Sequence, residues 1–118
     1  YEGIRRLANL VGPAMVKEIF FTARQFSAGE AQEMGLVNRM LPPHMLVPYV
    51  DDYAKRISEN APMTMESVKA IVQAIQDDES ARDLDALDAM VKACFASQDY
   101  IEGRRAFMEK RKPDFTGS

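Results

Sequence analysis

Apolar residues recur at helical spacing along almost the whole chain, and short breaks rich in proline, glycine or polar residues separate these runs. The first run falls at positions i, i+3, i+4 and i+7, the stripe of an amphipathic helix; it comprises Ile4, Leu7, Ala8 and Val11. Gly12 suits the end of that helix, and Pro13 suits the first turn of the next. The pattern therefore predicts helices joined by short breaks, with almost no strand.

The same spacing recurs as far as the end of the chain. A third longer helix carries Val50 and Ile57 on one face, and Pro48 is expected in its first turn, because a proline in a helix interior costs about 3 kcal/mol. Residues 36–42 are apolar, short and followed by a second proline, which predicts an extended link. We predict an all-α fold of six or seven helices with one short extended link, in a single helical domain over residues 1–118.

Local signals mark two helix starts. Ser27 and Glu30 have the spacing of a capping box, in which each side chain accepts a hydrogen bond from the other residue's backbone N–H, and Gly35 suits the end of that short helix. Either Ser97 or Asp99 can cap the last helix.

Composition excludes several classes of protein. The net charge is −3, so we expect no nucleic-acid partner. No apolar run approaches the roughly 20 residues that span a bilayer, so we expect no membrane partner either. The single cysteine fits a reducing compartment, and no signal peptide is visible; together these favour a cytoplasmic location.

The sequence contains no residue pattern typical of a catalytic site. The chain has neither the His and Cys spacing of a zinc site nor a phosphate-binding glycine loop. His44 is the only histidine and follows two prolines, so we interpret it as a solvated or capping residue. Cys94 lies on an apolar stripe and is interpreted as structural. The sequence thus predicts no catalytic residue and no metal site within residues 1–118.

The last helix carries the one chemically suggestive pattern. Five basic residues cluster near its end: Arg104, Arg105, Lys110, Arg111 and Lys112. Basic side chains at a helix C-terminus complement the helix dipole, which explains them without a ligand. Phe107 stands one turn from the cluster, and an aromatic face beside a cation is one way to hold a nucleotide base with its phosphate. Both interpretations stay open on these residues alone.

Three motifs extend this pattern over nearly the whole chain. "FTARQFSAGEAQEMGLVNRMLPP" and "DYIEGRRAFMEKRKPDF", preceded by "GIRRLANLVG", resemble the enoyl-CoA hydratase/isomerase (crotonase) family. The resemblance implies the C-terminal helical part of a crotonase-like fold. It implies that Phe107 and Lys110 help to hold the nucleotide end of coenzyme A, and that Gly103 allows close packing of the last helix. No cofactor is required; a coenzyme A thioester is the substrate of the parent enzyme.

The resemblance also implies what lies outside this chain. Family members are about twice as long, and their N-terminal spiral domain carries the oxyanion hole and, in hydratases, two catalytic glutamates. The chain alone is therefore expected to be inactive, while the parent assembles as trimers or hexamers. Ala23 stands where the family often has glycine, which puts the turn geometry there in doubt. Two alternatives remain: a helical oligomerisation or interaction module without coenzyme A contact, and a stand-alone helical acyl-CoA carrier.

Overall fold

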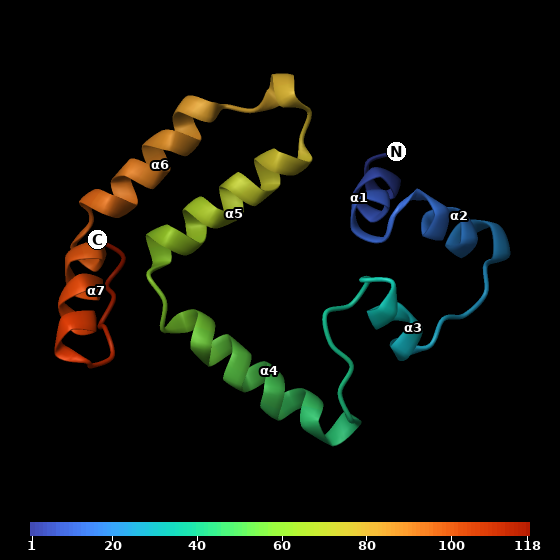
Figure 1. Ribbon diagram of the computed structural model, residues 1–118, viewed down its shortest axis with the longest axis horizontal. Helices are drawn as coiled ribbons and strands as arrows, with labels where there is room; N and C mark the ends of the chain where they lie inside the picture. The colour runs from blue at the N-terminus through green and yellow to red at the C-terminus, as the bar shows by residue number, and fades with distance from the viewer. The chain divides into compact units, whose positions relative to one another are not determined.

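The computed structural model describes all 118 residues and contains seven α-helices, one short 3₁₀ helix and no strand (Figure 1). The helices are α1 (Glu2–Val11), α2 (Pro13–Thr22), α3 (Ala28–Glu33), α4 (Pro43–Ser58), α5 (Pro62–Gln76), α6 (Leu84–Ala96) and α7 (Gln98–Glu109), with η1 (Glu79–Ala81) between α5 and α6. Residues 36–42 contain neither helix nor strand. The predicted all-α fold and its non-helical link are confirmed.

The chain divides into two compact units, residues 1–47 and 48–118. The boundary falls inside α4, whose first five residues group with the first unit. The grouping of both units into one domain of the complete protein stays a prediction.

In the first unit, turn residues set the breaks between helices. Gly12 separates α1 from α2 with φ at 83°, a conformation that costs glycine little. Gly35 also has positive φ, at 79°, just after α3. Ala23 ends α2 in the left-handed region with φ at 48°, a conformation that generally disfavours alanine relative to glycine.

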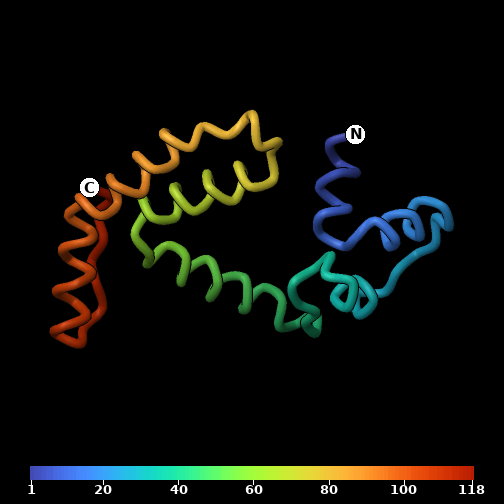
Figure 2. The backbone as a smooth tube through the Cα atoms, turned by 45° about the horizontal axis from the view of Figure 1, so that its top comes forward, coloured from blue at the N-terminus to red at the C-terminus, as the bar shows by residue number.

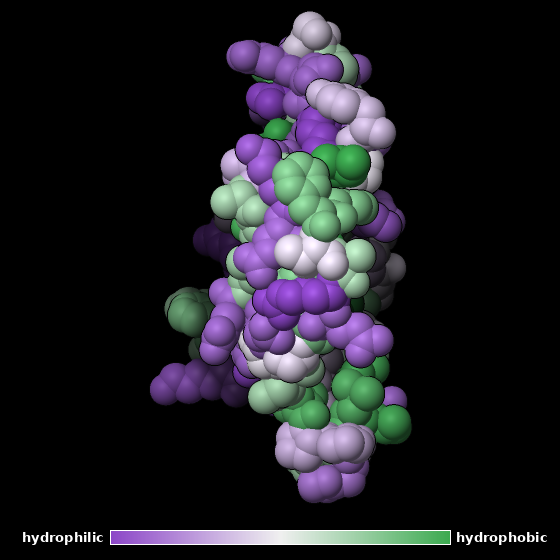
Figure 3. Space-filling model, turned by 90° about the vertical axis from the view of Figure 1, so that its right-hand side faces the viewer, coloured by the Kyte–Doolittle hydropathy of each residue, from purple (hydrophilic) through white to green (hydrophobic).

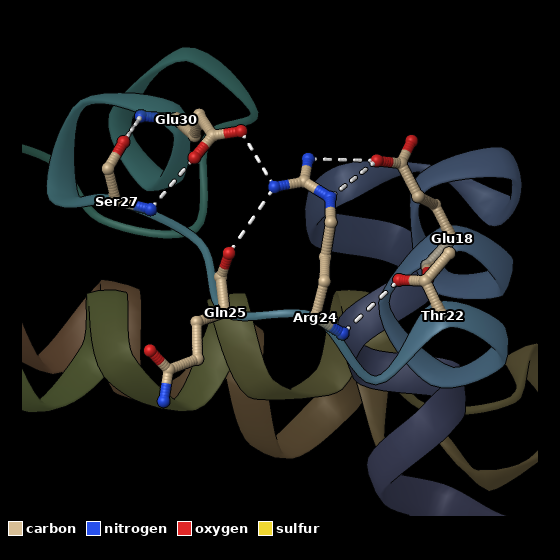
Figure 4. A network of polar contacts seen from close by, with 6 residues as sticks. All are labelled: Glu18, Thr22, Arg24, Gln25, Ser27 and Glu30. Carbon is tan, nitrogen blue, oxygen red and sulfur yellow. Dashed lines mark hydrogen bonds and ion pairs between the residues drawn. The ribbon is translucent and has the colours of Figure 1, made fainter.

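A polar network joins α2 to α3 across this turn (Figure 4). The Arg24 guanidinium lies 2.9 Å from the Glu18 carboxylate and 2.8 Å from the Glu30 carboxylate, and it stacks 3.8 Å above the Phe26 ring. The predicted capping box is present: the Ser27 N–H donates to Glu30 over 2.8 Å, and the Glu30 N–H donates to Ser27 Oγ over 3.2 Å. The Ser27 N–H, with Arg24, lowers the pKa of Glu30. The link between α2 and α3 is therefore held at both ends.

The position predicted for Pro48 is wrong. Helix α4 begins at Pro43, so Pro48 lies inside the helix and beyond its first turn. Pro43 can start the helix because proline lacks a backbone N–H and none is needed at the first helical position. The Met45 N–H donates to the Pro42 carbonyl over 2.9 Å. Pro48 then removes one interior hydrogen bond at an exposed part of the helix.

In the second unit, α5 and α6 run side by side in opposite directions, and α7 follows α6 (Figure 1). The chain after α7 turns and runs back beside that helix (Figure 2). We call residues 111–118 the tail strap.

Few apolar side chains are buried within this chain. Among hydrophobic residues only Val16 and Ala106 are buried. Large apolar side chains remain exposed on most helices, including Phe21, Val47, Ile75 and Phe107, and Figure 3 shows apolar residues interspersed with hydrophilic ones on one face. Each helix is too short or too polar to cross a membrane.

Replacing Ala23 with glycine should stabilise the fold by about 1 kcal/mol, because glycine adopts the left-handed conformation without the Cβ penalty. The urea or thermal unfolding midpoint should rise. Ala89→Gly is the matched control: Ala89 is exposed inside α6, so glycine there should lower the midpoint. A fall for both variants would contradict the left-handed turn.

Candidate functional site

An apolar groove of about 590 Å³ lies among α5, α6, α7 and the tail strap. Its lining includes Met63, Ile71, Phe95, Tyr100, Phe107 and Phe115. Phe115 also lines a second apolar groove, of about 670 Å³, along α5 and the end of α4. A concave apolar surface with a few polar groups at its edge is typical of a small-molecule site.

Aromatic side chains dominate one end of the first groove. Phe95 and Tyr100 meet edge to face with ring centroids 5.2 Å apart. The Arg104 guanidinium lies 5.9 Å from the Tyr100 ring centroid, and Phe107, one turn further along α7, is 82% exposed. This end of the groove therefore offers an uncovered aromatic face near a cation, an arrangement suited to a planar ring that carries negative charge.

Only one of the two residues predicted to bind coenzyme A lines the groove. Phe107 lines the groove, whereas Lys110 does not. Lys110 ends α7 in the left-handed conformation with φ at 54°, and its side chain is exposed and has no ion pair within this chain. Their role in ligand binding stays a prediction.

Ion pairs divide the five basic residues into two groups. Arg111 contacts Glu102 over 2.5 Å and Glu109 over 2.6 Å, and Lys112 lies 3.3 Å from Glu59. Hydrogen bonding to Glu102 raises the pKa of Arg111 above its usual range. Arg104, Arg105 and Lys110 form no ion pair with a carboxylate in this chain. Arg105 lines a separate polar hollow with Glu102 and Asp114, whereas Arg104 lines the groove with Phe107, and Lys110 follows Phe107 by three residues. Arg104 and Lys110 are therefore the cations best placed to attract an anionic ligand near Phe107.

From the sequence, Asp99 was predicted only as a possible helix cap and not as a site residue. The helix cap is Ser97, whose Oγ accepts from the Tyr100 N–H over 3.0 Å. Asp99 is only 3% exposed and instead binds the tail strap: its carboxylate accepts from the N–H groups of Thr116 over 2.7 Å and Gly117 over 2.9 Å. In the sequence, an aspartate near the start of a helix looks the same whether its carboxylate caps that helix or binds a distant segment.

The other singled-out residues lie away from this end of the groove or play supporting parts. His44 is exposed in the first turn of α4. Cys94 is half-buried at the groove lining, where its thiol contacts Ser67 Oγ over 3.6 Å. A Cβ placed on Gly103 would lie 3.5 Å from the Phe115 ring, an ordinary packing distance. No group of three or more His, Cys, Asp or Glu side chains is arranged to hold a metal ion.

A helical chain with an apolar, cation-edged groove matches a known class of protein. The family model described as enoyl-CoA hydratase/isomerase matches residues 2–118. The chain is 40% identical to crotonyl-CoA hydratase of Syntrophomonas wolfei and 32% identical to methylmalonyl-CoA decarboxylase of Escherichia coli, over 98% of its length in both cases. A crystal structure of enoyl-CoA hydratase from Bacillus anthracis is 34% identical over 99% of this chain, with a TM-score of 0.81.

The chain belongs to the enoyl-CoA hydratase/isomerase family. It spans less than half the length of these relatives: 44% of the crotonyl-CoA hydratase, 45% of the decarboxylase and 45% of the crystallised hydratase. The resemblance noted in the sequence motifs is thereby confirmed.

Acidification should leave the contact between Arg111 and Glu102 intact until the pH is very low. The Arg111 guanidinium, helped by the Asp114 N–H, lowers the pKa of Glu102 from its ordinary 4.5 to about 2. This contribution to stability is present above pH 4.5 and is lost as the pH falls through about 2. Titration of the Glu102 carboxyl carbon by NMR should show a midpoint near pH 2, which Arg111→Gln should raise. A midpoint near 4.5 in the unsubstituted protein would contradict the ion pair.

Proposed function

We propose that this chain is the C-terminal helical part of an enzyme that hydrates or isomerises enoyl-CoA thioesters, in fatty-acid or related acyl-CoA metabolism. The observation that carries the proposal is the groove beside α7, where exposed Phe107 stands near Arg104 and one turn from Lys110. The names of the relatives add support, because a hydratase and a decarboxylase share a coenzyme A thioester substrate while differing in reaction.

In this proposal the chain binds coenzyme A, and the catalytic residues lie outside residues 1–118. Phe107 stacks against the adenine ring, and base–aromatic stacking of this kind contributes about 1–3 kcal/mol. Lys110 and Arg104 attract the phosphates, for which a compact ammonium is a good point-charge partner. Because Lys110 does not line the groove in this chain, we propose that it meets the nucleotide at the rim of the site or in a neighbouring subunit.

The reaction follows from the family resemblance. The thioester carbonyl binds in an oxyanion hole, which stabilises the negative charge that develops on the oxygen. One glutamate activates water and another delivers a proton. The proposal assigns the oxyanion hole and both glutamates to the part of the enzyme outside residues 1–118, and it requires no metal or other cofactor.

The exposed apolar helix faces are candidate surfaces for association with other parts of the enzyme. Unpartnered apolar surface favours association. We propose that these faces pack on the remainder of the enzyme and on neighbouring subunits in a trimer or hexamer. The proposed location is the cytoplasm, with no nucleic-acid or membrane partner.

A second candidate is a helical oligomerisation or interaction module that makes no contact with coenzyme A. The observation in its favour is the same scarcity of buried apolar residues, which a purely structural role explains equally well. The two candidates differ in what they require of Phe107 and Lys110.

Replacing Phe107 with alanine in the complete protein should weaken coenzyme A binding about tenfold, because the stacking surface is lost. Phe107→Tyr keeps the aromatic face and should bind nearly as well. Lys110→Ala should also weaken binding, and more so at low salt because its contribution is electrostatic. Calorimetric titration with coenzyme A measures all three affinities.

Lys17→Ala is the matched control for Lys110, since Lys17 is an exposed lysine on α2. It should leave the affinity unchanged. Unchanged affinity in both Phe107→Ala and Lys110→Ala would overturn the binding role and favour the interaction module.

The 118-residue chain alone should not hydrate crotonyl-CoA, because the proposed catalytic groups lie elsewhere. The loss of enoyl absorbance on adding purified chain should match that of buffer, while the complete enzyme serves as the positive control. Turnover close to that of the complete enzyme would refute the assignment of catalysis to another part of the protein.

A further inference from the structure

Asp99 is the most deeply buried carboxylate in the chain, and the proposed reaction does not use it. It lies in the first turn of α7, where the helix dipole favours negative charge. Its two oxygens accept from two successive backbone N–H groups, of Thr116 and Gly117, and its own N–H donates to the Ser118 carbonyl over 3.1 Å. Hydrogen bonds to an ionised carboxylate are about twice as strong as neutral ones. Asp99 therefore clamps the end of the tail strap.

Glu102 provides a second anchor one turn later on α7. Its carboxylate accepts from the Asp114 N–H over 3.0 Å and binds the Arg111 guanidinium through two hydrogen bonds, of 2.5 and 3.0 Å. Residues three apart on a helix share a face, so Asp99 and Glu102 present their carboxylates to the same side. The strap is consequently held at its start, middle and end as it runs back along α7 (Figure 2).

Phe115 lies between the anchored residues Asp114 and Thr116. Its ring packs beside Gly103 of α7 and lines both apolar grooves of this unit. Gly117 packs near Pro62, with which α5 begins, so the strap connects α7 to α5. A side chain flanked by two fixed backbone N–H groups has little freedom to move out of the groove wall.

We propose that Asp99 and Glu102 are positioning residues: they fix the tail strap so that the Phe115 ring forms the wall shared by the two grooves, and this wall shapes the pocket for the coenzyme A thioester. The inference rests on the proposed function for the identity of the ligand. The anchoring itself depends only on the hydrogen bonds of Asp99 and Glu102.

Asp99→Asn in the complete protein tests the anchor. An amide of the same shape has one acceptor oxygen instead of two, so one strap N–H loses its partner. Backbone amide exchange at Thr116 and Gly117 should rise about tenfold or more, and trypsin should cut faster after Lys110 and Arg111. The KM for the thioester should rise while kcat changes little. Asp114→Asn is the matched control, because it makes the same change from carboxylate to amide at an exposed side chain and keeps the backbone N–H that binds Glu102. It should alter neither exchange at Thr116 and Gly117 nor KM.

Phe115→Ala tests the wall without touching the anchor. Exchange at Thr116 and Gly117 should stay slow while KM rises, and Phe115→Leu should recover part of the affinity. If Asp99→Asn does not fold, this variant and the slow exchange of the unsubstituted protein decide the proposal.

The outcomes separate this inference from the proposed function. Unchanged exchange in Asp99→Asn overturns the anchoring role. If Asp99→Asn shows faster exchange but an unchanged KM, and Phe115→Ala also leaves KM unchanged, the proposed role of the wall is overturned. This holds even if Phe107→Ala weakens coenzyme A binding. Unchanged coenzyme A affinity in Phe107→Ala counts against the proposed function instead.

Discussion

The burial of apolar helix faces is the constraint on which this structure depends. The longer helices carry apolar stripes, yet only Val16 and Ala106 among the hydrophobic residues are buried within the chain. Hydrophobic burial is the main favourable term in folding, so faces left uncovered here need partners. Under the proposed function those partners are the remainder of the enzyme and its neighbouring subunits. Polar contacts therefore fix much of the local geometry: the Arg24 network in the first unit and the Asp99 and Glu102 anchors in the second.

Local signals in the sequence predicted much of the fold because they act over a few residues. The apolar spacing predicted the helices, the Ser27–Glu30 pair predicted its capping box, and the comparison with glycine predicted a difficult turn at Ala23. Each of these depends on backbone geometry within one helix or one turn. Pro48 was misplaced because the start signal at Pro43 and the penalty for an interior proline conflict, and the helix start prevails.

The candidate site was less predictable, since its geometry comes from residues far apart in sequence. Phe107 was identified through a family motif, and the structure places it in an apolar groove. The selection of Arg104 and Lys110 among five basic residues required the ion pairs of Arg111 and Lys112 and the position of Arg105 away from the groove. Asp99 binds residues 17 and 18 positions away, a distance at which neither helical periodicity nor capping rules give a signal. The groove wall formed by Phe115 depends on that long-range contact.

Helix α7 and the tail strap together form the proposed binding site. The helix presents an aromatic face and two available cations, and the strap closes one side of the groove. The most direct measurement is a crystal structure of the complete protein with a bound acyl-CoA. We predict that the adenine ring lies against Phe107, with Phe115 lining the pocket that receives the ligand. A nucleotide bound elsewhere, with both rings free of ligand contact, would contradict it.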